Sequence, residues 1–261
     1  MNNYDDILDS IKKHLQSFNM EIDAFERYRF HGDSIYPAVE NEIKSNKNLL
    51  ITDSASISFN MPMDITSSIS HVDYLREIAS MSIQEFKSLI VKKVNSYIKN
   101  NGETHFIDFS TSNISEYKRI DPIIDELGLM NSKIIVSNSR VISELQDSSL
   151  FKNDYIKKKK NNSNSFEKIG YLNQTIVYLD PYLDWKKNYI LGFDKCLLDW
   201  DKVNVFNTLG PQISPVIYIQ FELKFYVKNP KILYIYTPEY MDEYALYKVK
   251  RRDDRIDEVL G

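Results

Sequence analysis

The sequence predicts an α+β protein, with helices in the first half of the chain and most strands in the second. Three observations predict this class. Residues 216–228 alternate apolar and polar side chains with a strict period of two, the pattern of a strand that buries one face. Residues 83–98 repeat apolar side chains at helical spacing. Residues 133–138 form a short apolar run between two helical patterns, which indicates a compact α/β layer.

Length and composition set broad limits. The chain has 261 residues, 43% hydrophobic and 13% aromatic, which is enough for a substantial core and for one large or two modest domains. The net charge of −4 does not indicate a polyanion binder. The single cysteine, Cys196, excludes an internal disulfide framework and a cysteine-only metal site. No apolar run approaches the ~20 residues of a membrane span, so no membrane partner is expected.

The first 64 residues predict a helix, an arm and a strand. Residues 4–20 form an amphipathic helix, residues 21–48 lack a sustained period and are expected to be extended, and residues 49–64 predict a strand or hairpin. The apolar face of the helix consists of Ile7, Leu8, Ile11, Leu15 and Phe18.

The clearest helix follows in the sequence. Ser82 and Glu85 have the spacing of a capping box, and Gly102 supplies a C-terminal stop. The helix would have about 20 residues and be ~30 Å long at 1.5 Å per residue.

Four short elements are expected next. Residues 105–110 predict a strand, Asp121-Pro122 begins a helix that Gly128 ends, and residues 133–138 predict a buried strand. The following short helix carries Val141, Ile142 and Leu145.

The second half of the chain is strand-rich. Residues 157–165, KKKKNNSNS, form a solvated low-complexity loop. The β segments that follow are GYLNQTIVYLD, NYILGF, KVNVF and finally residues 216–236, and the charge-dense residues 238–261 predict an exposed tail or a last helix.

Glu222-Leu223-Lys224 is the sharpest candidate for enzyme chemistry. Metal-dependent nucleases place Glu-x-Lys on a strand because period two puts both side chains on one face, where the carboxylate holds Mg²⁺ and the lysine positions water. An upstream aspartate is also required, and Asp194, Asp199 and Asp201 are available. The competing interpretation is the polar face of an ordinary strand, on which alternating charges are expected, and this interpretation is favoured.

The other polar clusters favour structural roles. Asp180 and Asp184 flank Pro181, and an Asp-Pro pair after an alternating run indicates a strand end and a turn before it indicates a metal site. Cys196 lies among apolar residues, which predicts a buried thiol. The histidines have no metal-ligand spacing: His14, His31, His71 and His105. No catalytic residue, cofactor or metal is therefore expected.

The order of these pieces resembles the major capsid proteins of tailed phages, which have the Hong Kong 97-type fold. Residues 131–146 resemble the axial-domain strand and helix of that family, and residues 188–200 resemble a strand with a glycine-containing turn. Residues 169–183 resemble the hairpin of the myophage capsid branch, with Asp-Pro-Tyr after the strand. Residues 220–236 resemble the closing strand, basic residue, proline and last short strand.

The resemblance implies a domain organisation. The domains would be an N-terminal arm at 1–48, an extended hairpin loop at 49–80, a peripheral domain made of a spine helix at 81–102 and strands at 170–236, an axial domain at 103–169, and a tail at 237–261.

The resemblance also implies a function. The chain would be a structural subunit, not an enzyme, that self-assembles into an icosahedral or prolate viral shell around the genome. Its partners would be copies of itself in pentameric or hexameric capsomers, other capsid proteins, scaffold and portal proteins, and packaged DNA without sequence-specific contact. Its location would be the virion, after assembly in the host cytoplasm. Three alternatives stay open: a minor, vertex or encapsulin-like shell subunit, the Mg²⁺-dependent nuclease, and an adaptor that binds partners through aromatic side chains.

Overall fold

The computed structural model describes residues 3–17, 24–27, 51–60, 71–107, 120–154, 166–184, 187–209 and 215–235. The chain divides into two compact units. The first unit contains residues 1–94 and 196–226, and the second contains residues 95–195 and 227–261. Helices and two mixed sheets are both present, which confirms the predicted α+β class.

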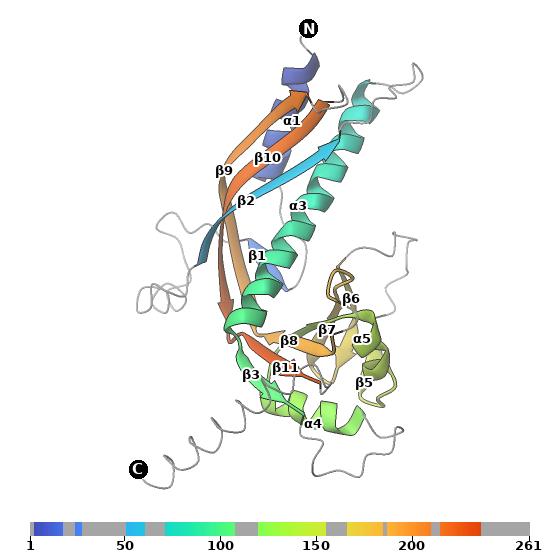
Figure 1. The fold of residues 1–261 in the computed structure, drawn as a ribbon. Helices are drawn as coiled ribbons and strands as arrows, with labels where there is room; N and C mark the ends of the chain where they lie inside the picture. The colour runs from blue at the N-terminus through green and yellow to red at the C-terminus, as the bar shows by residue number, and fades with distance from the viewer. Residues whose placement is uncertain are drawn as a thin grey trace, which may run out of the picture. The chain divides into compact units, whose positions relative to one another are not determined.

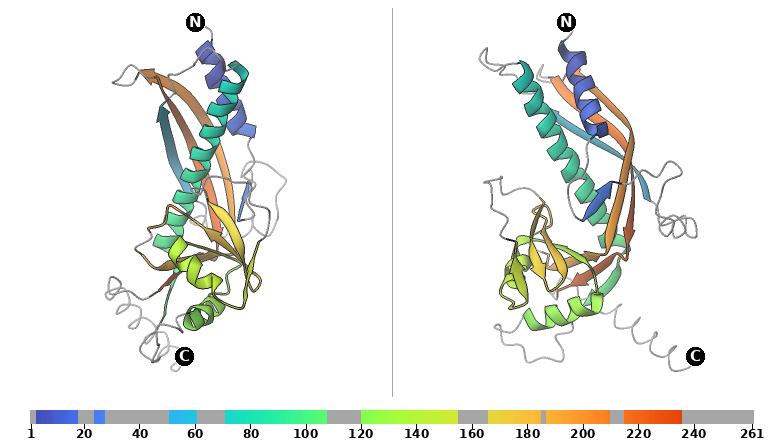
Figure 2. Two further views of the ribbon diagram at one scale, coloured as in Figure 1. Left: turned by 90° about the vertical axis from the view of Figure 1, so that its right-hand side faces the viewer. Right: turned by 180° about the vertical axis from the view of Figure 1, so that it is seen from behind.

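The first unit is built on a four-stranded sheet with two helices on one of its faces (Figure 1). The helices are α1 (Asn3–Ser17) and α3 (His71–Asn101), the latter up to Val94. Figure 2 shows from behind that both helices lie on the same side of the sheet. The strand order is β1 (Phe25–Arg27), β9 (Lys195–Leu209), β10 (Pro215–Lys228) and β2 (Ile51–Asn60).

Aromatic packing joins α3 to the sheet. The fully buried Phe86 ring lies 5.2 Å from the Trp200 ring of β9 and 4.5 Å from the Phe221 ring of β10, measured between centroids. Such ring pairs stabilise beyond the apolar area they bury. The period-two prediction for β10 is confirmed as far as Phe225, and the buried face up to there consists of Ile217, Ile219, Phe221, Leu223 and Phe225. The alternation ends at Tyr226, which was predicted to be on the polar face but is buried.

The predicted start of the long helix is wrong. α3 begins at His71, so Ser82 lies inside the helix, where it is buried at 1% exposure and does not cap it together with Glu85. The Ser-x-x-Glu spacing also fits a helix interior, and the sequence alone does not distinguish the two. The predicted end is confirmed, since α3 stops at Asn101 and the Gly102 N–H donates to the Ile98 carbonyl at 2.8 Å.

The N-terminal segments contribute the helix α1 and the strands β1 and β2 to the first unit. The predicted first helix is confirmed as α1, which ends at Ser17, while residues 18–20 lie outside the described residues. Of the strand or hairpin predicted at 49–64, a strand is confirmed as β2, and residues 49–50 and 61–64 lie outside the described residues. The antiparallel partner of β2 is β10, with Ile57 opposite Ile219. Within the predicted arm, β1 pairs parallel with β9, and residues 28–48 lie outside the described residues.

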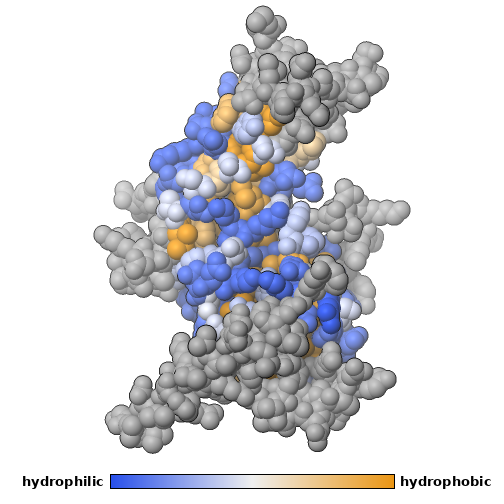
Figure 3. Space-filling model, in the orientation of Figure 1, coloured by the Kyte–Doolittle hydropathy of each residue, from blue (hydrophilic) through white to orange (hydrophobic). Residues whose placement is uncertain are grey.

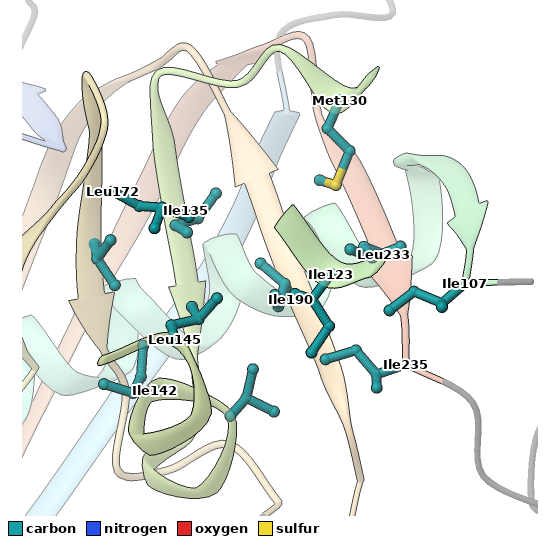
Figure 4. Close-up of a cluster of buried hydrophobic side chains, with 12 residues drawn as sticks. Ile107, Ile123, Met130, Ile135, Ile142, Leu145, Leu172, Ile190, Leu233 and Ile235 are labelled. Carbon is teal, nitrogen blue, oxygen red and sulfur yellow. The ribbon is translucent and has the colours of Figure 1, made fainter. Parts of the chain in front are cut away.

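The second unit holds a seven-stranded sheet with two short helices, α4 (Ile120–Met130) and α5 (Ser139–Gln146). Figure 4 shows how side chains from both helices gather with side chains from the sheet into one apolar cluster. The strand order is β3 (Glu103–Phe106), β11 (Lys231–Tyr234), β8 (Tyr189–Phe193), β4 (Ile134–Ser137), β7 (Thr175–Leu179), β6 (Glu167–Leu172) and β5 (Phe151–Asn153).

The predicted stop of the helix at Gly128 is also wrong. α4 runs through Gly128 to Met130 and ends at Asn131, which has a φ of 47°. A glycine inside a helix costs about 1 kcal/mol relative to alanine. Burial of the whole Met130 side chain in the core offsets that cost, because a buried methionine contributes about 1.5–3 kcal/mol.

The other elements of the second unit follow the prediction except β5, which was not predicted from the sequence. β4 and α5 are confirmed, and Asn138 caps α5 by accepting a hydrogen bond from the Val141 N–H at 3.1 Å. The strand predicted at 105–110 begins earlier, at Glu103 of β3, and residues 108–110 lie outside the described residues, as do 157–165 and 238–261.

The two compact units and the implied domains group the strands differently. β6, β7 and β8 lie in the second unit together with residues 103–154, whereas the resemblance groups residues 170–236 with the spine helix. The assignment of peripheral and axial roles stays a prediction.

We expect Phe86→Ala to lower the free energy of unfolding by about 3–5 kcal/mol, since it leaves a cavity between α3 and the sheet. Gln84→Ala is the matched control, because Gln84 is exposed on the same helix and its loss changes stability by less than about 0.5 kcal/mol. Urea denaturation followed by tryptophan fluorescence measures both. Equal midpoints for the two variants would contradict the packing described.

Alanine substitutions at two glycines are predicted to shift the Tm in opposite directions. An alanine Cβ at Gly192 in β8 would lie 2.5 Å from Ser132 Oγ and 2.6 Å from Met130 Cε, so Gly192→Ala overpacks the core and costs about 1–3 kcal/mol. An alanine Cβ at Gly128 meets nothing within 4 Å, and Gly128→Ala gains about 0.5–1 kcal/mol in the helix. Thermal unfolding should show the Tm falling for Gly192→Ala and rising for Gly128→Ala. If the Tm of both variants moved in the same direction, the tight packing at Gly192 or the open space at Gly128 would be refuted.

Candidate functional site

The candidate residues Glu222 and Lys224 lie on the face of β10 that points away from α3. Their neighbours on β10, Phe221, Leu223 and Phe225, are buried on the opposite face. In the register with β2, Glu222 is opposite Ser54 and Lys224 is opposite Thr52. We call this surface the outer face of the first sheet.

Four alternating charges on the outer face form one chain of ion pairs. The Lys202 Nζ lies 2.6 Å from Glu222 Oε2, and the Lys224 Nζ lies 3.1 Å from Glu222 Oε1 and 3.0 Å from Asp201 Oδ2. The hydrogen bonds from Lys202 and then Lys224 hold the pKa of Glu222 below its ordinary value. Burial alone would lower the pKa of Lys224, but its bonds to Asp201 and Glu222 raise it above the ordinary value.

A local irregularity in β9 brings two of these charges to one side. Trp200 and Val203 are buried, while Asp201 and Lys202 both reach the outer face and Lys202 has a φ of 51°. Two successive residues on one face, one of them left-handed, are the signature of a β-bulge. Sequence reasoning missed Lys202, because no glycine or asparagine marks the position.

The other two candidate aspartates do not join this group. Asp199 is 5% exposed, and its Oδ1 accepts the Trp200 N–H at 2.9 Å. Asp194 belongs to the second unit, where it accepts a hydrogen bond from the Asn229 side chain at 2.6 Å. Of the three predicted aspartates, the structure brings only Asp201 to Glu222 and Lys224.

The geometry is that of a charge-paired strand face. A nuclease site needs carboxylates that converge on a cation. Here one lysine, Lys224, lies between Glu222 and Asp201. Within the described ranges no group of three histidine, cysteine, aspartate or glutamate side chains could hold a metal. The described residues therefore do not assemble the predicted nuclease constellation.

The prediction that Asp180 ends a strand and forms a turn is confirmed. Asp180 is 1% exposed; its Oδ1 accepts the Tyr182 N–H at 2.9 Å and its Oδ2 accepts the Asn95 side-chain amide at 2.6 Å. Burial, followed by the nearby charges of Asp180 and Asp184, raises the pKa of Tyr189 to about 12. These contacts hold a turn in place and leave Asp180 without access to solvent.

The remaining titratable candidates are structural or lie outside the description. Cys196 is completely buried, which raises the pKa of its thiol well above the ordinary value and confirms the prediction of a buried thiol. His105 Nε2 lies 3.4 Å from Glu103 Oε1, and His14 is exposed on α1. His31 and the His71 side chain lie outside the described residues.

A shallow polar depression of about 360 Å³ lies on the outer face. Its polar lining consists of Ser54, Ser56, Lys202, Asn204, Gln220 and Glu222.

None of the helices in the described part of the chain is long and apolar enough to cross a bilayer.

Several solved structures are similar to this chain. A virus-like particle from Pyrococcus furiosus has a TM-score of 0.47 and 6% identity, covering 89% of this chain and 100% of that one. The SrpI encapsulin complex from Synechococcus elongatus PCC 7942 has a TM-score of 0.42 and 10% identity, covering 71% and 73%. The satellite phage P4 procapsid has a TM-score of 0.40 and 8% identity, covering 71% of both chains. No family model and no curated protein matches the sequence.

We expect the Glu222 carboxyl group to titrate below the ordinary glutamate value of 4.5. Because its pKa in the folded state is depressed, its ion pairs stabilise the fold above the unfolded value and are lost as the pH falls through the folded value. Carbon-13 NMR of the side-chain carboxyl over a pH series measures the midpoint. Lys202→Met should move that midpoint upward, and a wild-type midpoint at or above 4.5 would refute the pairing.

Proposed function

We propose that this chain is a structural subunit that assembles with copies of itself into a closed shell, and more specifically a capsid protein with the Hong Kong 97-type fold. The observation that carries the proposal is the order and packing of the elements. A strand, β2, precedes the long helix α3, and the small helices and strands come next. The strands β9 and β10, against which Phe86 of α3 packs, follow later in the chain. This is the order that the resemblance to tailed-phage capsid proteins implies.

The surface of the described residues exposes several large hydrophobic side chains. Large hydrophobic side chains are exposed at five positions in the described ranges: Met81, Leu129, Leu150, Tyr182 and Phe206. Figure 3 shows hydrophobic residues interspersed among hydrophilic ones on one side of the molecule. Singly exposed apolar side chains are normal on protein surfaces, so the proposal rests on the order and packing of the elements.

The finer proposal concerns the shell and its contents. The subunit would form pentameric or hexameric capsomers, join other capsid, scaffold and portal proteins, and enclose a viral genome in a virion assembled in the host cytoplasm. A net charge of −4 suits confinement of DNA without sequence-specific contact, because confinement requires no basic binding surface. The proposal assigns the chain no enzymatic activity, since the charges on the outer face neutralise one another.

The purified protein should form rings or closed particles over a concentration and salt series, measured by light scattering and negative-stain microscopy. Glu222→Ala should assemble like the wild type, because the proposal gives the ion pairs no role between subunits. A monomer in every condition, including with candidate scaffold protein added, would contradict the proposal. Mg²⁺-dependent cleavage of plasmid DNA that Glu222→Ala abolishes would replace it with the nuclease.

A further inference from the structure

The edges of the two sheets differ in one respect. The described residues contain four edge strands. Three are short and carry charged or ionisable side chains: β1 has three residues with Glu26 and Arg27, β5 has three with Lys152, and β3 has four with Glu103 and His105. Short length and charge are the devices by which proteins prevent strands of other molecules from pairing at an edge.

β2 is longer than the other edge strands and carries a single charge, which is ion-paired. It has ten residues and contains no lysine, arginine, proline or glycine. Its single charged side chain, Asp53, is held by an ion pair with Lys93 of α3. In the sheet of the described residues, β2 pairs with β10 on one edge, and no strand lies on the other.

The backbone of β2 can therefore accept another strand. In an antiparallel pair, alternate residues turn both their N–H and C=O groups away from the partner. Half of the residues of β2 thus direct both groups toward the open edge. Long exposed edges of this kind are the sites at which β-augmentation occurs.

The side chains of β2 are complementary to a second copy of β2. Thr52, Ser54, Ser56 and Ser58 share the outer face, and Asp53, Ala55 and Ile57 share the face toward α3. Antiparallel pairing of two copies with Ser56 opposite Ser56 places Ser54 opposite Ser58 and Ala55 opposite Ile57. Hydroxyl then meets hydroxyl on the outer face, and apolar meets apolar at Ala55 and Ile57 on the other face. Farther from the axis on that face, Asp53, which is ion-paired with Lys93, comes opposite Phe59 in the register.

We infer that β2 is an interface between two copies of this chain, which pair antiparallel along their β2 edges about a two-fold axis near Ser56. The pairing joins two four-stranded sheets into one continuous sheet. Identical patches on both subunits are the rule for two-fold contacts. The choice of a second copy as the occupant rests on the proposed function; the open edge itself does not.

Cysteine crosslinking tests this contact. Ser54→Cys, Ser56→Cys and Ser58→Cys are nearly isosteric changes, and the native Cys196 is too buried to react. Mild oxidation of Ser56→Cys should give a covalent dimer, and a mixture of Ser54→Cys with Ser58→Cys should crosslink as a pair. Ser143→Cys, exposed on α5, is the control and should crosslink at least about tenfold more slowly, because thiols far apart cannot bridge.

Introducing charges at Ser56 gives an independent test of the contact. Ser56→Lys and Ser56→Glu should each weaken self-association by at least about tenfold, since like charges face each other across the axis. An equimolar mixture of the two variants should restore it. Equal association of wild type, both variants and the mixture would overturn the inference.

The combined outcomes separate the inference from the proposed function. Particles whose β2 cysteines do not crosslink faster than the control would support the shell and overturn the β2 contact. Crosslinked dimers without rings or particles would support the β2 contact and overturn the shell. A protein that neither assembles nor crosslinks would overturn both.

Discussion

The first unit depends on Trp200, because this one side chain contacts three segments that are distant in sequence. Its ring meets Phe86 of α3, its indole N–H donates to the Leu15 carbonyl of α1 at 2.9 Å, and the Arg27 guanidinium of β1 lies 4.1 Å above the ring. A buried indole needs a partner for its N–H, and α1 supplies that partner. The helix at the N-terminus and the strand after it are thereby tied to the sheet on which α3 packs.

The second unit relies on buried polar contacts as well as its apolar cluster. Asp180, Asn138 and Ser137 are almost completely buried. The Ser137 hydroxyl donates to the Tyr189 carbonyl at 2.6 Å, and the Asn138 amide donates to the carbonyls of Asp184 and Lys187 at 3.0 and 2.8 Å. Buried polar groups are costly unless they are paired, and these contacts hold Asp184, Lys187 and Tyr189 against the end of β4.

Sequence reasoning succeeded where the structure at a residue follows from the residues next to it in the sequence. The buried face of β10 and the end of α3 at Gly102 were both predicted from local patterns. It failed where distant packing decides. Burial of Met130 carries α4 past Gly128, and the partner of β2 lies far along the chain. At α3 a local signal was overlooked, because Ser70 and Asp73 have the same capping-box spacing as Ser82 and Glu85 and flank the start of the helix at His71. Within the candidate site, Lys202 was missed because a bulge, and not a pattern, brings it to Glu222.

Charges on the outer face and at the edge of the first sheet are both paired within the first unit. Glu222 and Lys224 pair with each other and with Lys202 and Asp201, so their charges are balanced within the first sheet. Asp53 is likewise neutralised by Lys93, and this removes the one charge that could protect the edge of β2. A protein that must remain monomeric protects every exposed edge, because an unprotected one recruits other strands. In the described sheets, the edge strands β1, β3 and β5 are short and carry charged or ionisable side chains, whereas β2 is the longest edge strand and lacks this protection. This difference favours a subunit that pairs with a copy of itself along β2.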